Sequence, residues 1–198
     1  MEHSKKSWVE QLIFLGLIAY FVFGYLPIAN FNASRGIYHV VGFSWEEKIP
    51  FLAPFILGYA LVYLSVLFVY WVIPNKFVFK KMAWGFFWVT TLHYIFFILF
   101  PVKMVWRPEI VEVNNFFDWL AQFIFSMDNT YNCFPSLHVA YPTMATVIAW
   151  RFIPRYRYFF LSLALITAIS VVLVKQHYMV DALAGALLSI LVGVLIPR

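Results

Sequence analysis

The sequence predicts an all-α integral membrane protein, a bundle of six transmembrane helices with one further helix lying in the membrane interface. Three observations lead to this fold class. Hydrophobic residues make up 64% and aromatic residues 22% of the 198 residues. The mean hydropathy of +0.82 is too high for a soluble domain. Six apolar runs approach the about 20 helical residues that a bilayer core requires. We therefore expect residues 1–198 to form a single membrane domain.

The six expected spans cover residues 8–28, 51–73, 82–100, 135–153, 158–174 and 177–196. The first run is longer than the roughly 7–15 apolar residues of a cleavable signal peptide, so we interpret it as a span. Prolines mark the expected boundaries, because a helix tolerates the missing N–H and the ring best near its ends. These prolines are Pro27, Pro50, Pro74, Pro101, Pro135 and Pro154.

A stretch rich in aromatic residues, from Phe116 to Phe125, lies between the third and fourth spans. Polar residues interrupt it irregularly, which predicts a helix lying in the membrane interface. Two roles remain open for this helix. It anchors the loop at headgroup depth, as aromatic belts do, or it guides a lipid to a neighbouring site.

The basic residues indicate the orientation in the membrane. They are scattered between apolar runs, so the formal net charge of +5 is typical of topology signals and does not predict nucleic-acid binding. With a cytoplasmic N-terminus, five of the 14 Lys and Arg residues lie outside, and we expect both termini in the cytoplasm. The outer five are Arg35, Lys48, Lys103, Arg107 and Lys175.

His177 and Asp181 stand four residues apart and therefore share one face of a helix. A carboxylate that accepts from one ring nitrogen leaves the other nitrogen with a free lone pair. This arrangement suits a nucleophile or a base. A purely structural His–Asp hydrogen bond produces the same spacing.

Pro135, Ser136, Leu137 and His138 open the fourth span. The N–H groups of a first helical turn lack helical acceptors and, with the helix dipole, form an anion site to which the Ser136 hydroxyl adds a donor. His138 then lies where it can give a proton to a leaving oxygen. An ordinary helix start with an interfacial histidine is the alternative interpretation.

Cations gather on the same expected outer side. Lys103 and Arg107 follow the third span, and Lys175 lies in the turn before His177. Cations at helix ends often only reach for the interface. Together with two histidines and a carboxylate, however, they favour phosphoryl transfer, in which cations and N–H donors stabilise the equatorial oxygens.

These residues resemble the signatures of the type-2 phosphatidic acid phosphatase superfamily. The first match is Phe134-Pro135-Ser136-Leu137-His138, and the second is Ser170-(six residues)-His177-Tyr178-(two residues)-Asp181. The resemblance implies that His177 forms a phosphohistidine, that Asp181 orients it and that His138 protonates the leaving alcohol. It also implies phosphate contacts from Ser136, the Leu137 N–H, Lys103 and Arg107.

Three positions depart from these signatures. Phe100 stands where the family has a lysine, and Val171 where it has an arginine, so Lys175 is expected to supply charge. Leu137 replaces a glycine, and this Leu form resembles the branch of the superfamily that includes inositol phosphorylceramide synthases and related sphingolipid head-group transferases. We therefore expect hydrolysis of a phosphomonoester or diphosphate lipid on the outer face, with head-group transfer to a lipid alcohol as the alternative.

The sequence favours neither a metal nor a cofactor. It has no Cys or His pair at zinc spacing and no carboxylate cluster for magnesium beside the expected site. Cys133 is the only cysteine, which excludes an intramolecular disulfide. Two other classes stay open: a haem-binding electron carrier with His138 and His177 as axial ligands, and a lipid transporter or scaffold without catalysis.

Overall fold

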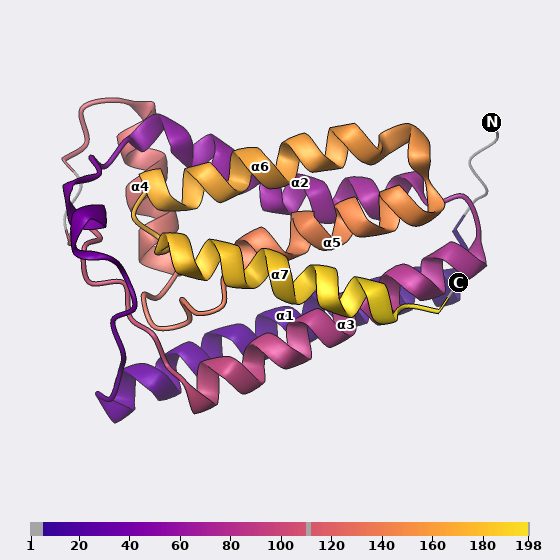
Figure 1. Ribbon diagram of the computed structural model, residues 1–198, viewed down its shortest axis with the longest axis horizontal. Coiled ribbons are helices and arrows are strands. Elements are labelled where there is room, and N and C mark those ends of the chain that lie inside the picture. Colours follow the sequence, from indigo (N-terminus) through magenta and orange to yellow (C-terminus); the bar gives the residue numbers. More distant parts are fainter. Residues whose placement is uncertain (1–5, 110–111, 198) are drawn as a thin grey trace.

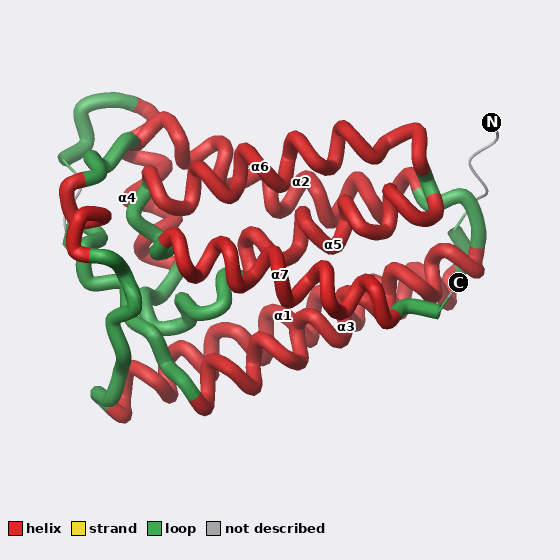
Figure 2. Tube along the Cα trace, viewed as in Figure 1, coloured by secondary structure: helices red, strands yellow, loops and turns green. Residues whose placement is uncertain are grey.

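The computed structural model describes residues 6–109 and 112–197, which form seven α-helices and three short 3₁₀ helices (Figures 1 and 2). The α-helices are α1 (Trp8–Arg35), α2 (Ile56–Val72), α3 (Lys76–Leu99), α4 (Phe116–Met127), α5 (Leu137–Phe152), α6 (Arg157–Leu173) and α7 (Met179–Leu195). The 3₁₀ helices are η1 (Ser44–Lys48), η2 (Ala53–Phe55) and η3 (Pro154–Tyr156). The all-α prediction is therefore confirmed for the described residues.

Helix α5 lies at the centre of the bundle. It contacts α2, α3, α6 and α7, whereas α1 packs mainly on α3. Eleven of its 16 residues are buried, among them every residue from Leu137 to Ala145. The residues at the start of α5 are therefore held by protein on all sides, which a reacting group requires.

Four of the helical segments are long and apolar enough to cross a membrane. They are Trp8–Arg35, Ala53–Val72, Lys76–Leu99 and Pro154–Leu173. Helices α5 and α7 have 16 and 17 residues and reach only about 24–26 Å at 1.5 Å per residue. Among the described residues, the expected six spans thus include four of full length.

Helix α1 continues beyond its expected end. Pro27 lies inside it, and the helix ends only at Gly36, whose positive φ of 65° forms the C-cap. We expected Pro27 to mark the boundary, but membrane helices tolerate proline because neighbouring groups satisfy the freed carbonyl. The positive φ costs glycine little, and Gly36 therefore determines the end.

The outer surface of the bundle is apolar. On α7, Leu183, Leu187 and Leu191 are spaced four residues apart and are 60–62% exposed. Such a stripe is unfavourable in water over the length of a helix and favourable against lipid. Together with the four long helices, it identifies an integral membrane protein.

Loops and α4 gather at one end of the bundle (Figure 2). Helix α4 lies across that end, whereas α1 begins and α7 ends at the opposite end (Figure 1). Val102 bridges to His39 and to Asn132, so three loop segments lie side by side. The N–H of Met104 donates to the Thr130 carbonyl at 3.0 Å, and these bonds fix the segment that leads into α5.

Candidate active site

His177 lies in the turn between α6 and α7, one residue before the α7 N-cap. Its Nδ1 is 3.0 Å from the Cys133 carbonyl oxygen and 3.5 Å from Asp181 Oδ2. Both neighbours accept hydrogen bonds, so Nδ1 carries the proton and Nε2 keeps its lone pair. His177 Nδ1 therefore has the Cys133 carbonyl as a second acceptor beside Asp181, and the spacing in the sequence does not reveal this carbonyl.

Asp181 is fixed by its place in the first turn of α7. Its Oδ2 accepts the backbone N–H of Tyr178 at 2.9 Å in a capping arrangement. The residue is fully buried, and Oδ1 has no hydrogen-bond partner among the described residues. A buried carboxylate with so few donors is held for interaction with the neighbouring imidazole.

His138 brings the second imidazole to the first. Its Nδ1 lies 3.2 Å from His177 Nε2, although 39 residues separate the two in the chain. On the other side of the ring, His138 Nε2 lies 2.6 Å from the Tyr59 hydroxyl. The free nitrogen of His177 thus faces a group that can carry a proton.

The start of α5 is built around Ser136, the N-cap residue. Its hydroxyl accepts the N–H of Val139 at 3.4 Å, and its own N–H donates to the Asp181 carbonyl at 2.9 Å. Gly185 of α7 packs on the same residue, and a Cβ there would overlap the Ser136 carbonyl. Close contact between α5 and α7 therefore sets the distance between the two histidines.

Arg107 reaches the edge of the site from the loop before α4. Its guanidinium donates to the Asp128 carbonyl at 2.8 Å and to Gln176 Oε1 at 2.9 Å. It also stacks 4.7 Å from the Phe125 ring centre. Burial lowers the pKa of Arg107, yet a guanidinium stays charged at any physiological pH. Arg107 is thus a fixed positive charge bound to Gln176, the residue next to His177 in the chain.

The two lysines of the predicted set have other partners. The Lys103 ammonium lies 5.0 Å from the ring centres of both Tyr38 and Tyr131. The Lys175 ammonium donates to the carbonyls of Glu46 and Glu47 at 2.7 and 3.3 Å. Burial lowers the pKa of Lys175. Neither ammonium contacts His138 or His177 in this arrangement.

Sequence reasoning missed four side chains at the site. Asp128 accepts the hydroxyl hydrogens of Tyr59 at 2.7 Å and Tyr25 at 2.8 Å, and Gln176 binds Arg107. The tyrosines lie inside apolar runs, where nothing in the pattern sets them apart. Asp128 belongs to the polar stretch before α5, whose residue types are typical of a turn.

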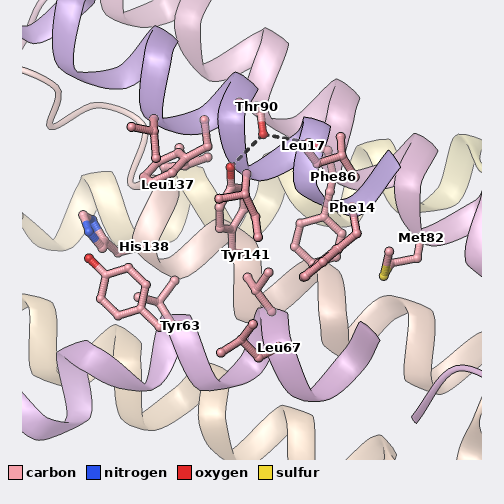
Figure 3. A pocket seen from close by; sticks show the side chains of 15 residues that line it. Phe14, Leu17, Tyr63, Leu67, Met82, Phe86, Thr90, Leu137, His138 and Tyr141 are labelled. Atoms are coloured by element: carbon pink, nitrogen blue, oxygen red, sulfur yellow. Dashed lines mark hydrogen bonds between the residues drawn. The ribbon is translucent and has the colours of Figure 1, made fainter. Parts of the chain in front are cut away.

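An apolar cavity of about 240 Å³ opens beside His138 (Figure 3). In this view His138 lies at one end and Met82 near the other, with Tyr141 and Phe14 between them. Its walls come from α1, α2, α3 and α5. Leu137 lines it next to His138, so the reacting end of the site borders a hydrophobic chamber.

One group of potential metal ligands occurs among the described residues. Donor atoms of Cys133, His177 and Asp181 lie within 4.8 Å of one another. The Cys133 thiol already donates to the Thr130 carbonyl at 3.0 Å, and burial raises its pKa well above the usual range. A metal would need the thiolate and would compete with the His177–Cys133 bond. The donor set therefore fits a metal poorly.

Comparison with protein families gives a match over most of the chain. A family model described as the PAP2 superfamily matches residues 28–195. Comparisons with curated proteins and with solved structures find no match. Members of the matched superfamily are phosphatases or related enzymes, which supports an enzyme with phosphatase-type function. Because the match extends from the last part of α1 to the end of α7 and includes every site residue from Lys103 to Asp181, the chain belongs to the PAP2 superfamily.

Proposed function

We propose that the protein is a lipid phosphatase that removes phosphate from a lipid phosphomonoester or diphosphate through a phosphohistidine at His177. One observation carries the proposal: His177 Nε2 faces His138 Nδ1 at 3.2 Å, while its Nδ1 is held by the Cys133 carbonyl and Asp181. A nucleophile with its far side fixed, next to a proton carrier, is the arrangement that covalent phosphoryl transfer requires.

The first half of the reaction joins phosphorus to His177. Its Nε2 attacks the phosphorus, the bond from phosphorus to the lipid oxygen breaks, and that oxygen takes a proton from His138. Phosphorus and the leaving oxygen then lie between the two rings, so substrate binding replaces the His138–His177 contact. In the second half, water gives a proton to His138 and attacks the phosphohistidine, which releases phosphate.

A cation and hydrogen-bond donors must stabilise the negative charge on the phosphoryl oxygens. We assign this role to Arg107, the Ser136 hydroxyl and the first-turn N–H of Leu137, because all three lie at the start of α5 or beside His177. Lys103 and Lys175 lie at the same end of the bundle but bind other groups. We propose that they act through the local electrostatic potential.

The apolar cavity supports a lipid as the substrate. The hydrocarbon chain attached to the leaving oxygen must begin beside His138, and the cavity begins there too. Its 240 Å³ is below the roughly 300–1,000 Å³ of pockets that enclose a drug-sized ligand. A single hydrocarbon chain fits this space better than a bulky head group.

Helix α4 supports the expected membrane placement. Phe116, Trp119 and Phe123 are at least half exposed and stack on one another along one face. A transverse helix with such a face suits the interface at headgroup depth. We therefore propose six spans, with α5 and α7 as the two short ones, and α4 as the interfacial helix.

We further propose that the site opens on the non-cytoplasmic side. The start of α1 and the end of α7 lie at the end of the bundle opposite to the start of α5 and the α6–α7 turn (Figure 1), which carry His138 and His177. The excess of basic residues predicts that the end with the start of α1 and the end of α7 is cytoplasmic.

Head-group transfer is the second candidate, and the position of Leu137 favours it. This side chain is 2% exposed and lines the cavity next to His138. An apolar neighbour keeps water from a phosphohistidine and gives a lipid alcohol time to react. Both reactions share the first half.

One experiment tests both hydrolysis and head-group transfer. Phosphatidate or a polyprenyl diphosphate, labelled in the phosphate, is supplied in micelles with and without diacylglycerol or ceramide. Hydrolysis releases free phosphate, and transfer moves the label to the added alcohol. An acid-labile label on the wild-type protein, missing from His177→Ala, identifies the phosphohistidine. Wild-type protein that releases no phosphate and labels no alcohol contradicts the proposal.

A further inference from the structure

Tyr59 and Asp128 contact the side of His138 that faces away from His177. The Tyr59 hydroxyl lies 2.6 Å from His138 Nε2 and 2.7 Å from Asp128 Oδ2. Tyr59 is fully buried on α2, and Asp128 is the C-cap of α4. Residues from three distant parts of the chain thus form one continuous hydrogen-bond chain, from the Cys133 carbonyl through both histidines to the Asp128 carboxylate.

This chain of contacts needs one proton more than its neutral groups carry. The hydrogen on His177 Nδ1 points at a carbonyl, which only accepts. Three contacts remain: His138 to His177, His138 to Tyr59, and Tyr59 to Asp128. A neutral His138 and Tyr59 supply only two hydrogens, and a carboxylate supplies none. One additional proton completes the network.

His138 can take that proton, because both of its ring nitrogens lie within hydrogen-bond distance of an acceptor. Asp128 accepts a hydroxyl hydrogen on each carboxylate oxygen, from Tyr25 at 2.8 Å and from Tyr59 at 2.7 Å. His138 Nε2 lies 3.8 Å from Asp128 Oδ2. With the proton on His138, an imidazolium and a carboxylate would form a pair that the Tyr59 hydroxyl bridges.

The other ionisable groups around His138 do not replace Asp128. Tyr25 comes from α1 and Tyr63 from α2, Tyr141 lies on the same helix, and His177 comes from the α6–α7 turn. Arg107 binds the Asp128 carbonyl from the neighbouring loop. Among these described residues, Asp128 alone brings a negative charge to the His138 ring.

We propose that Tyr59 and Asp128 are positioning residues that hold His138 as the proton donor of the reaction, an inference that rests on the proposed function. In the first half, the His138 Nδ1 proton moves to the leaving oxygen as the bond to phosphorus breaks. His138 is left neutral, and its Nε2–H still donates to Tyr59. In the second half, the proton that water loses returns to Nδ1, which restores the pair.

Two substrates separate this role from a structural one. The leaving group of phosphatidate is the alkoxide of diacylglycerol, which needs the proton. The leaving group of 4-nitrophenyl phosphate is the stable 4-nitrophenolate, which does not. For Asp128→Asn and Tyr59→Phe we expect kcat with phosphatidate to fall by about 10²-fold, the lower range for a general acid, and a much smaller loss with 4-nitrophenyl phosphate. The falling limb of the pH–rate profile should move to lower pH in Asp128→Asn, and Asp128→Glu should restore part of the rate.

Tyr25→Phe is the matched control, because it removes a similar bond to Asp128 outside the path to His138. Tyr59 still bridges Asp128 and His138 in this variant, so the ratio of the two rates should change far less than in Tyr59→Phe. Equal losses on both substrates in Asp128→Asn and Tyr59→Phe overturn the positioning role of Tyr59 and Asp128. The phosphatase proposal still stands in that case if the wild-type activity depends on His177.

A measurement without turnover covers inactive or unstable variants. Nitrogen NMR of ¹⁵N-histidine-labelled protein in micelles reports the protonation of His138 directly. We expect an imidazolium in the wild type at neutral pH and a neutral ring in Asp128→Asn. A neutral His138 in the wild type overturns the inference even where no substrate has been found.

Discussion

The carbonyl oxygen of Cys133 lies 3.0 Å from His177 Nδ1, closer than the 3.5 Å between this nitrogen and Asp181 Oδ2. The ring of His177 therefore has two acceptors on its far side, one from the backbone and one from a side chain. A substitution at Asp181 leaves the carbonyl in place. Removal of the imidazole removes the proposed nucleophile itself.

His177→Ala and Asp181→Asn should therefore differ in severity. We expect His177→Ala to abolish phosphate release, because the proposed nucleophile is lost. Asp181→Asn should lower kcat by at least about 10²-fold, since the imidazole loses its charged partner, yet retain a measurable rate because the Cys133 carbonyl still holds Nδ1–H. Phosphate release from both proteins, matched for folding by gel filtration, checks the order. A rate in His177→Ala equal to that of Asp181→Asn contradicts it.

Gly185→Ala should damage the site through packing. A Cβ at Gly185 would overlap the Ser136 carbonyl, which is backbone and cannot turn aside. Overpacking of this kind costs about 1–3 kcal/mol, so both the melting temperature in detergent and the activity should fall.

Gly16→Ala is the control for this substitution. No atom lies within 4 Å of an added Cβ at Gly16, and alanine is the better helix former by about 1 kcal/mol. Its melting temperature should stay unchanged or rise. Equal melting temperatures in Gly185→Ala and the wild type contradict the packing argument.

Most of the fold was predictable from the sequence, because apolar runs and prolines locate helices even when their ends differ. Helix α3 begins at Lys76 rather than near Met82, since Asn75 caps it and accepts the Val78 N–H. A hydropathy pattern excludes the charged first two turns of α3, which contain Lys76, Lys80 and Lys81. A lysine at a helix end, however, extends into the interface and leaves the backbone helical.

The pairing of the histidines was predictable for a similar reason: two polar residues at the same edge of neighbouring spans meet. Tyr59 and Asp128 were not, because their roles depend on where α2 and the end of α4 lie in space. The partners of Lys103 and Lys175 depend on loops in the same way. Spacing alone identifies a cation near the site, and only the fold gives its contacts.

Arg107 should therefore matter more than either lysine. Arg107→Lys loses the planar group that donates to both Asp128 and Gln176, and lysine replaces such paired bonds poorly. We expect kcat/KM for phosphatidate to fall by at least about tenfold, the equivalent of 1.4 kcal/mol. Lys103→Met should reduce it less, because its ammonium lies over two tyrosine rings. Steady-state rates at two ionic strengths check this, and a larger loss in Lys103→Met would reverse the ranking.

Activity should persist in EDTA, and vanadate, which mimics five-coordinate phosphorus, should inhibit. Histidine chemistry needs no metal, and the thiol of Cys133 is buried and bonded to the Thr130 carbonyl. Cys133→Ser should keep most of the activity, because its backbone carbonyl remains. A strict requirement for magnesium contradicts this view. So does loss of activity in Cys133→Ser, if added zinc restores activity to EDTA-treated wild-type protein but not to the variant.

Labelling of single cysteines tests the proposed orientation. In a Cys133→Ser background, Asn114→Cys should react with a membrane-impermeant maleimide from the outer face, and Arg155→Cys only from the cytoplasm. Both positions are exposed, and they lie in the loop before α4 and in η3, at opposite ends of the bundle. Labelling of both from one side contradicts the orientation.

Leu137→Ala should shift the reaction toward water. The Leu137 side chain is buried next to His138 and lines the apolar cavity, so its truncation opens a path for water to the phosphohistidine. With labelled phosphatidate and ceramide in the same micelles, the ratio of free phosphate to labelled new lipid should rise above that of the wild type. The ratio is informative even if truncation costs the about 2–5 kcal/mol usual for a buried leucine, because unfolded protein contributes to neither product. Leu67→Ala is the control, since Leu67 lines the same cavity but is 54% exposed. An unchanged ratio in Leu137→Ala, with new lipid as the main product in both proteins, would show that Leu137 does not control access of water.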